Sequence, residues 1–293
     1  MIETRGRRRY FIPLRGTEQP LGERTLVMGV LNVTPDSFSD GGRFAGADAG
    51  VAHGMELFAQ GADWVDVGGE STRPGAAPVM AEEETRRVAP VIEGLRSRGA
   101  GPLSVDTSKA EVARAALEAG ADLVNDVSGF GYDPAMAPLV ASRHVPAVLM
   151  HLRGGFGEMH RAPTYSDVMA EIVSELAEAL ARAEGAGVDR RLLIVDPGLG
   201  FSKDADHSLE ALRRLPELGA LDRPVLVGPS RKSFIGKLLD LPVERRLMGT
   251  AAAVASAVLL GAHVVRVHDV REMVEVVRVA DAVRGDSGEA RAA

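Results

Sequence analysis

The 293-residue sequence contains no cysteine, which excludes disulfide bonds and thiolate metal sites. It also has no basic stripe, and with a net charge of −7 we expect no nucleic-acid partner. No apolar segment follows the basic N-terminal residues, so we expect no secretory signal. The most apolar stretch, 249–267, is interrupted by Gly261, His263 and Arg266, which predicts a buried helix and strand and no membrane span. These features indicate a cytoplasmic protein.

Short β-branched runs alternate along the chain with segments of helical periodicity. The eight predicted strands are Leu26–Val33, Trp64–Gly69, Leu103–Asp106, Leu123–Val127, Ala147–His151, Leu192–Asp196, Val225–Gly228 and Val264–His268. The helical candidates include Ala49–Gln60, Glu82–Arg98, Lys109–Glu118, Tyr165–Glu184 and Leu247–Leu260. This alternation predicts a parallel sheet covered by helices. Eight units favour a single-domain (β/α)8 TIM barrel, although periodicity alone leaves an open doubly wound sheet possible.

Glycine marks three of the predicted helix ends. Gly61, Gly120 and Gly261 are each followed by alanine and then by a predicted strand, and glycine readily adopts the left-handed conformation that ends a helix. The barrel is expected over residues 25–284. Residues 1–24 are predicted to be an extension that forms a small hairpin closing the barrel floor, and residues 285–293 a flexible tail.

Polar residues follow every predicted strand, where barrel enzymes place their active sites. These strand ends are Asn32, Glu70 to Arg73, Asp106, Asn125 with Asp126, His151, Asp196, Ser230 to Ser233, and Arg266 to Asp269. Loops are polar in most proteins, so one such end carries no information. Eight of them directly after apolar runs are harder to explain, because buried polar groups are costly without a partner. A shared ligand would be that partner.

Two loops and two cationic groups indicate the kind of ligand. The loops at 29–42 and 68–75 are rich in glycine and small polar residues and can close over a reacting centre, although each could be a plain connector. Arg73 in the second loop suits an anion clamp. The segment 230–233 places hydroxyls and cations at a predicted helix start, where a carboxylate can bind. Arg266 and His268 share one strand face and suit phosphate.

These segments resemble those of the dihydropteroate synthases over roughly residues 25–270. The matching segments are NVTPDSFSDGG at 32–42, GESTRPG at 69–75, SVDT at 104–107, ND at 125–126, DPG at 196–198, SRKSF at 230–234 and RVHD at 266–269. The resemblance implies a transferase of folate biosynthesis on a (β/α)8 barrel. Such an enzyme condenses 6-hydroxymethyl-7,8-dihydropterin pyrophosphate with p-aminobenzoate, giving 7,8-dihydropteroate and pyrophosphate. The departures are Leu152, Ser202, Asp204 and Ser208, which put loop dynamics in doubt more than the reaction.

The resemblance also assigns roles to individual positions. The residues expected to bind pterin are Asp106, Asn125, Asp196 and Lys232. The residues expected to bind pyrophosphate are Asn32, Arg266 and His268, with Mg²⁺ held near Asn32. The residues expected to bind p-aminobenzoate are Thr72, Arg73 and Ser233. The residues expected to act in catalysis are Asp40, Arg73, Lys232, Arg266 and His268, with Asp40 stabilising the reacting pterin centre.

The implied chemistry is governed by charge, since the enzyme must stabilise a leaving polyanion and a pterin cation. A pterin-binding methyltransferase is the closest alternative, but it has no use for Thr72, Arg73 or the segment 230–233. A non-catalytic pterin-binding barrel is a second alternative, which nothing in the sequence favours. The resemblance further implies a homodimer, with Leu247–Leu260 and Met273–Val283 as candidate contact faces.

Overall fold

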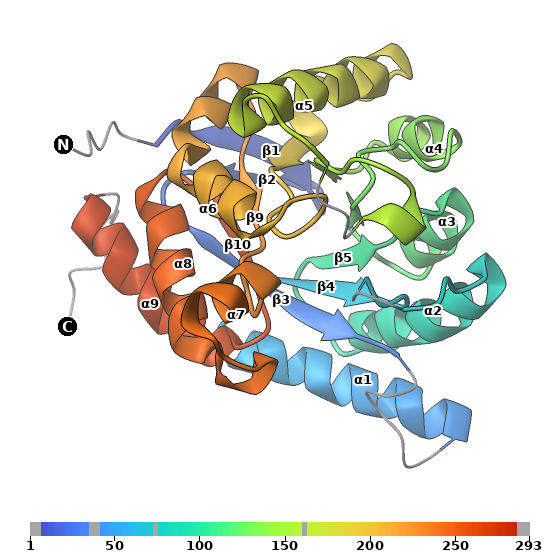
Figure 1. Ribbon diagram of the computed structural model, residues 1–293. Helices are drawn as coiled ribbons and strands as arrows, with labels where there is room; N and C mark the ends of the chain where they lie inside the picture. Colours follow the sequence, from blue (N-terminus) through green and yellow to red (C-terminus); the bar gives the residue numbers. More distant parts are fainter. Residues whose placement is uncertain (1–6, 35–41, 73–75, 160–162, 286–293) are drawn as a thin grey trace.

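A computed structural model describes residues 7–34, 42–72, 76–159 and 163–285 of the chain (Figure 1). Eight parallel strands surround one axis, and helices cover them on the outside. The strands of this ring are β3 (Leu26–Asn32), β4 (Trp64–Gly68), β5 (Leu103–Asp106), β6 (Leu123–Asp126), β7 (Ala147–Met150), β8 (Leu193–Asp196), β9 (Leu226–Val227) and β10 (Val264–Val267). The helices around them are α1 (Gly42–Ala59), α2 (Ala81–Ser97), α3 (Ala110–Glu118), α4 (Met136–Arg143), α5 (Val168–Gly185), α6 (Ala205–Arg213), α7 (Ser233–Leu239), α8 (Leu247–Leu259) and α9 (Val270–Arg284).

The ring is a barrel and not an open sheet. Neighbouring strands follow the chain from β3 to β8, and β10 pairs with both β3 and β9. The remaining gap between β8 and β9 is bridged by parallel pairing of Val195 with Val225, and the Val195 amide donates to the Pro224 carbonyl at 3.0 Å. The open-sheet alternative is therefore wrong, and the predicted barrel is confirmed.

An antiparallel hairpin closes the floor of the barrel, as the sequence predicted. Its strands are β1 (Tyr10–Leu14) and β2 (Thr17–Leu21). Ile12 and Leu21 are fully buried, and they pack in one cluster with inward-facing residues of the barrel strands. The hairpin thus supplies apolar surface that seals the N-terminal end of the barrel from water.

Alternation along the strands divides the barrel interior into an apolar floor and a polar upper layer. Side chains two residues apart on a strand share a face. The floor cluster contains Trp64, Leu123, Ile194 and Val264. Two residues further along the same strands stand Asp66, Asn125, Asp196 and Arg266. The strands therefore deliver polar side chains together at the C-terminal end of the barrel, above a sealed hydrophobic base.

Several boundaries differ from those that periodicity predicts. Helix α5 begins at Val168 and not at Tyr165, because the Asp167 carboxylate caps it by accepting hydrogen bonds from the amides of Met169 and Ala170. The sequence pattern did not single out α4 and α6, which have only 8 and 9 residues, and it predicted the start of α7 but not its extent. No described helix is long and apolar enough to cross a membrane. The predicted cytoplasmic location stays a prediction.

Candidate functional site

A pocket opens at the C-terminal end of the barrel and receives side chains from most of its strands. Its polar lining consists of Thr72, Asp106, Asn125, Asp196, Lys232 and Arg266. Its apolar lining consists of Val127, Met150, Leu199 and Phe201, and Gly228 completes the wall. Every residue predicted to bind pterin is among them. A narrow pocket with apolar walls and a few converging polar groups suits a small flat ligand.

A buried network of opposite charges forms one side of the pocket. The Arg266 Nε donates to Asp66 Oδ2 at 2.6 Å, and its Nη2 donates to Asp106 Oδ2 at 2.6 Å. Asn125 Nδ2 donates to the same Asp66 oxygen at 2.8 Å. Burial raises the pKa of Asp106 and Arg266 opposes that shift. The guanidinium thus compensates two carboxylates in the low-dielectric interior, and Asp66 fixes the orientation of the Asn125 amide.

Asp196 and Lys232 supply the remaining charges of the pocket. Asp196 is buried, and its Oδ1 accepts a hydrogen bond of 2.7 Å from the Gly198 amide. Desolvation raises the pKa of Asp196 to about 6. The Lys232 ammonium lies 3.7 Å from the centre of the Phe201 ring, a cation–π contact, and burial lowers its pKa. These contacts hold both side chains in place. They leave one edge of the Asp196 carboxylate and the Lys232 ammonium available to a ligand.

Asn32 and His268 lie at the rim of the barrel interior. Asn32 is the last residue of β3, and a side chain at Gly68 would place its Cβ 3.8 Å from Asn32 Oδ1 and 3.5 Å from Asp106 Cβ. His268 follows β10, and its Nδ1 lies 3.0 Å from Ser230 Oγ. Burial lowers the pKa of His268 to about 3, and Arg266 contributes to that shift. Arg266 is the third residue of β10 and His268 directly follows the strand, and their predicted joint role in binding phosphate stays a prediction.

Comparison with known proteins identifies the family. A model of the pterin-binding enzymes matches residues 28–268. The dihydropteroate synthase of Synechocystis sp. is 45% identical over 278 residues, covering 94% of this chain and 96% of that protein. That of Mycobacterium leprae is 49% identical over 263 residues, covering 87% and 92%. A solved structure of the Xanthomonas albilineans dihydropteroate synthase with 4-aminobenzoic acid superimposes with a TM-score of 0.88 at 47% identity, covering 94% and 99% of the two chains. The chain belongs to the dihydropteroate synthase family.

Dihydropteroate synthase activity, a transferase reaction, is therefore its function, and the resemblance found in the sequence is confirmed. A second Xanthomonas albilineans structure, in complex with 7,8-dihydropteroate, superimposes with a TM-score of 0.83 at 45% identity and covers 94% of this chain and 98% of that one. The methyltransferase and the non-catalytic alternatives are thereby wrong.

Of the residues predicted to bind the other substrates of dihydropteroate synthase, Thr72 and Arg266 line the pocket, whereas Asn32, Ser233 and His268 do not. Thr72 lines it, and Ser233 is the exposed first residue of α7, adjacent in sequence to Lys232. Asp40 and Arg73 lie outside the described residues, so their predicted roles stay predictions.

Several of the polar residues at the strand ends do not line the pocket, and three of them have other partners. The Asp126 carboxylate accepts hydrogen bonds from the amides of Ser128 and Phe130 and stabilises a turn. His151 is buried against helix α5 through Glu175. Arg231 is exposed and pairs with Asp269. Polar residues follow all eight predicted strands, but only some of these residues face the pocket.

Sequence reasoning missed Asp66 and Phe201. Asp66 is fully buried, and its Oδ1 has no hydrogen-bond partner among the described residues. The signal was available, because Asp66 interrupts an apolar strand on the same face as Trp64. Phe201 follows a glycine-rich turn after β8, and nothing in its sequence context indicates that its ring faces Lys232.

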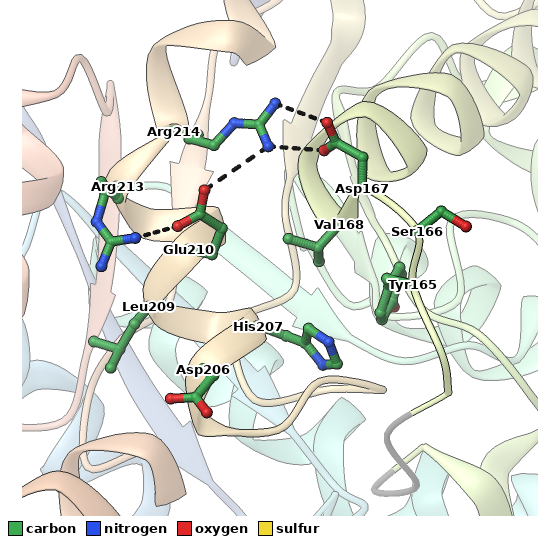
Figure 2. Close-up of a pocket in the computed structure, with 10 residues that line it drawn as sticks. All are labelled: Tyr165, Ser166, Asp167, Val168, Asp206, His207, Leu209, Glu210, Arg213 and Arg214. Carbon is green, nitrogen blue, oxygen red and sulfur yellow. Dashed lines mark hydrogen bonds and ion pairs between the residues drawn. The ribbon is translucent and has the colours of Figure 1, made fainter.

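A second hollow lies outside the barrel, between the start of α5 and helix α6 (Figure 2). Its arginines face carboxylates of the same hollow: Arg214 lies 2.8 Å from Asp167, and Arg213 pairs with Glu210. Because these charges compensate one another, we assign no ligand to this hollow.

Proposed function

We propose that the barrel pocket binds the pterin ring of 6-hydroxymethyl-7,8-dihydropterin pyrophosphate and presents it to p-aminobenzoate. The observation that carries the proposal is that Asp196, Asn125 and Lys232, which are far apart in the sequence, line one narrow pocket with apolar walls. A 2-amino-4-oxopyrimidine offers adjacent N–H donors, which the Asp196 carboxylate can accept. Its carbonyl and ring nitrogens need a donor, which Lys232 supplies.

The pyrophosphate group is proposed to lie toward Asn32, Arg266 and His268, at the rim beside the pocket. Among the described residues no group of three or more histidine, aspartate or glutamate side chains could hold a metal ion. Asn32 Oδ1 would be a hard oxygen ligand for Mg²⁺, and diphosphate oxygens and waters would supply further ligands. When bound, the ion neutralises charge on the leaving diphosphate. Arg266 supplies a permanent positive charge from the protein itself.

The p-aminobenzoate is proposed to lie at the outer side of the pocket, against Thr72, Arg73 and Ser233. Thr72 already lines the pocket, and Ser233 is next to Lys232 in the chain, which supports this placement. The Arg73 guanidinium would bind the carboxylate of p-aminobenzoate. The aniline nitrogen would then approach the methylene carbon of the pterin from the open side of the pocket.

The reaction is proposed to begin with cleavage of the C–O bond to pyrophosphate, because the dihydropterin delocalises the developing positive charge. Arg266 and hydrogen bonds from the neutral His268 ring stabilise the leaving polyanion, and Asp40 stabilises the pterin cation. The weakly basic aniline then attacks without a strong general base. Exclusion of water from the pocket would prevent hydrolysis of the cation.

Asp196→Asn tests the recognition step. It keeps the shape of the side chain but removes the charge that accepts the pterin N–H groups. We expect the dissociation constant for 6-hydroxymethylpterin, measured by calorimetry, to rise by roughly 10- to 100-fold, as for loss of hydrogen bonds to a charged group. A variant that binds the pterin as tightly as the native enzyme would overturn the assignment of this pocket.

We also propose that the enzyme is a homodimer that pairs through α8 and α9. These helices pack side by side, and their outer surfaces expose Met248 on α8 and Val279 with Val283 on α9. The three side chains are 66–78% exposed. Met248 lies at the start of α8 and the two valines lie near the end of α9, so exposed apolar side chains occur along this helix pair, as protein interfaces often show.

A further inference from the structure

A second buried lysine lies behind the pocket, away from the ligand side. Lys203 follows the turn after β8, and only 5% of its surface is exposed. Its Nζ lies 2.8 Å from His151 Nδ1, 3.3 Å from the Gly198 carbonyl oxygen and 3.1 Å from the Phe201 carbonyl oxygen. Three acceptors match the three protons of an ammonium group. Lys203 therefore ties the end of β7 to both ends of the turn 198–201.

The first of these carbonyls belongs to a residue that orients Asp196. The Gly198 amide donates to Asp196 Oδ1 at 2.7 Å, so the two polar backbone groups of Gly198 are held by Asp196 and Lys203. Gly198 has a φ of 67°, and an added Cβ would lie 2.1 Å from the His151 carbonyl oxygen. The turn is thus pressed against the end of β7, and Lys203 fastens it there.

The second carbonyl belongs to the residue that orients Lys232. The ring of Phe201 faces the Lys232 ammonium at 3.7 Å. Gly200, in the same turn, approaches so closely that an added Cβ would lie 3.3 Å from Lys232 Cδ. Any shift of the turn would move both the surface that Lys232 packs against and the cation–π partner of its ammonium.

The charge of Lys203 is compensated through an imidazole. His151 Nδ1 accepts from Lys203, and His151 Nε2 lies 3.0 Å from Glu175 Oε2 on α5. Burial, together with the charge of Lys203, lowers the pKa of His151 to about 4, so the ring is neutral and donates its Nε2 proton to Glu175. The Glu175 carboxylate thereby stabilises the charge of the Lys203 ammonium through the imidazole ring.

We propose that Lys203 is a positioning residue of the pterin site, which sets Asp196 through Gly198 and Lys232 through Phe201, and that Glu175 and His151 hold Lys203 in place. One ammonium at the back of the pocket thus fixes both charged groups at its front. The inference rests on the proposed pterin site. It predicts that loss of Lys203 weakens pterin binding although Lys203 does not line the pocket.

Lys203→Met tests the proposal, because methionine keeps the length and burial but removes the donors. We expect the dissociation constant for 6-hydroxymethylpterin, measured by calorimetry on the full chain, to rise about tenfold, as for loss of charged hydrogen bonds. The KM for p-aminobenzoate should stay within about twofold of the native value, because the hydrogen bonds of Lys203 go to none of the residues proposed to bind that substrate. A purely structural defect would lower the fraction of active enzyme and leave the pterin dissociation constant of the folded fraction unchanged. Lys237→Met, on the exposed side of α7, is the matched control and should bind pterin normally.

A second pair of variants decides the question if Lys203→Met does not fold. Glu175 and Glu171 both accept hydrogen bonds from Arg153, but only Glu175 contacts His151. Glu175→Gln should therefore weaken pterin binding by about threefold, a partial loss of charged hydrogen bonding, whereas Glu171→Gln should not. Native affinity in folded Lys203→Met, or equal affinities in the two glutamine variants, would overturn the role of Lys203. If instead Asp196→Asn also binds pterin normally, the pterin site itself is wrongly placed.

Discussion

At the scale of single residues, the site depends on Asp66, a carboxylate for which the sequence predicted no role. Asp66 is fully buried and forms a 2.6 Å ion pair with Arg266, which also holds Asp106. Two buried carboxylates around one guanidinium are stable only as a set, because each group alone would be an uncompensated charge in the interior. Asp66 therefore fixes the Arg266 side chain, and Arg266 in turn keeps Asp106 compensated.

Asp66→Asn should accordingly destabilise the fold. The substitution leaves Arg266 with one carboxylate fewer and should lower the free energy of unfolding by about 3–5 kcal/mol, the cost of breaking a buried ion pair. Urea denaturation followed by circular dichroism measures it. Glu118→Gln is the control: it breaks an ion pair of similar length with Arg143, but both partners are at least 37% exposed. It should cost about 1 kcal/mol or less. Equal losses in the two variants would contradict this account of Asp66.

The raised pKa of Asp196, about 6, predicts how pterin binding depends on pH. The carboxylate form accepts the pterin N–H groups, so affinity should rise between pH 5 and pH 7, roughly two units above the range of an ordinary aspartate near pH 4. The linked effect on folding has the opposite sign, because a group whose folded pKa is raised adds stability below its unfolded pKa and loses it as pH rises through the folded value. Calorimetric titration at several pH values measures the affinity. In Asp196→Asn the same pH dependence should be missing, and its persistence would assign it to another group.

At the scale of elements, the hairpin β1–β2 illustrates how an added piece completes the barrel. Its inner face packs on the floor cluster, whereas its outer face meets water: Ile12 is fully buried, and the adjacent Phe11 is 52% exposed. Side chains of neighbouring strand residues point to opposite faces, so two consecutive positions sample the two environments.

Ile12→Ala should therefore lower the free energy of unfolding by about 2–5 kcal/mol, because it leaves a cavity in the floor cluster. Phe11→Ala, which removes a larger side chain from the exposed face, should cost less than about 1 kcal/mol, as surface substitutions usually do. Thermal or urea unfolding compares the two. Both variants should keep the native pterin affinity, since the hairpin lies at the opposite end of the barrel; an effect on binding would show that the floor and the pocket are coupled.

At the scale of the whole molecule, the faces of α8 and α9 predict assembly. Val279→Asp places a charge in the proposed contact and should convert the dimer to a monomer, with a mass near the 30.9 kDa of one chain by light scattering. Met80→Asp, at an 80% exposed position before α2, is the control and should leave the mass unchanged. A native enzyme that is itself monomeric at assay concentration would remove the proposal.

Much of the molecule could be predicted from the order of its residues. The eight strands were found because parallel barrel strands are buried on both faces and form short apolar runs. Asp106, Asn125, Asp196, Lys232 and Arg266 were found because they follow such runs or lie near their ends. Helices α4 and α6 were not singled out, and α7 was predicted only at its start, since short helices carry too few turns for a clear periodicity. The sequence also could not separate the outward-facing Asp126 and His151 from their ligand-facing neighbours.

By itself, the sequence determined the fold class, the family and the polar residues that line the pocket, because local periodicity and ordered motifs are encoded along the chain. Only the tertiary structure decided which groups neutralise one another. Asp66 with Arg266, Phe201 with Lys232, and Lys203 with His151 are contacts between separate loops and strands, formed across the barrel or behind it. Charge compensation and burial depend on distances in space, and no spacing in the sequence specifies them.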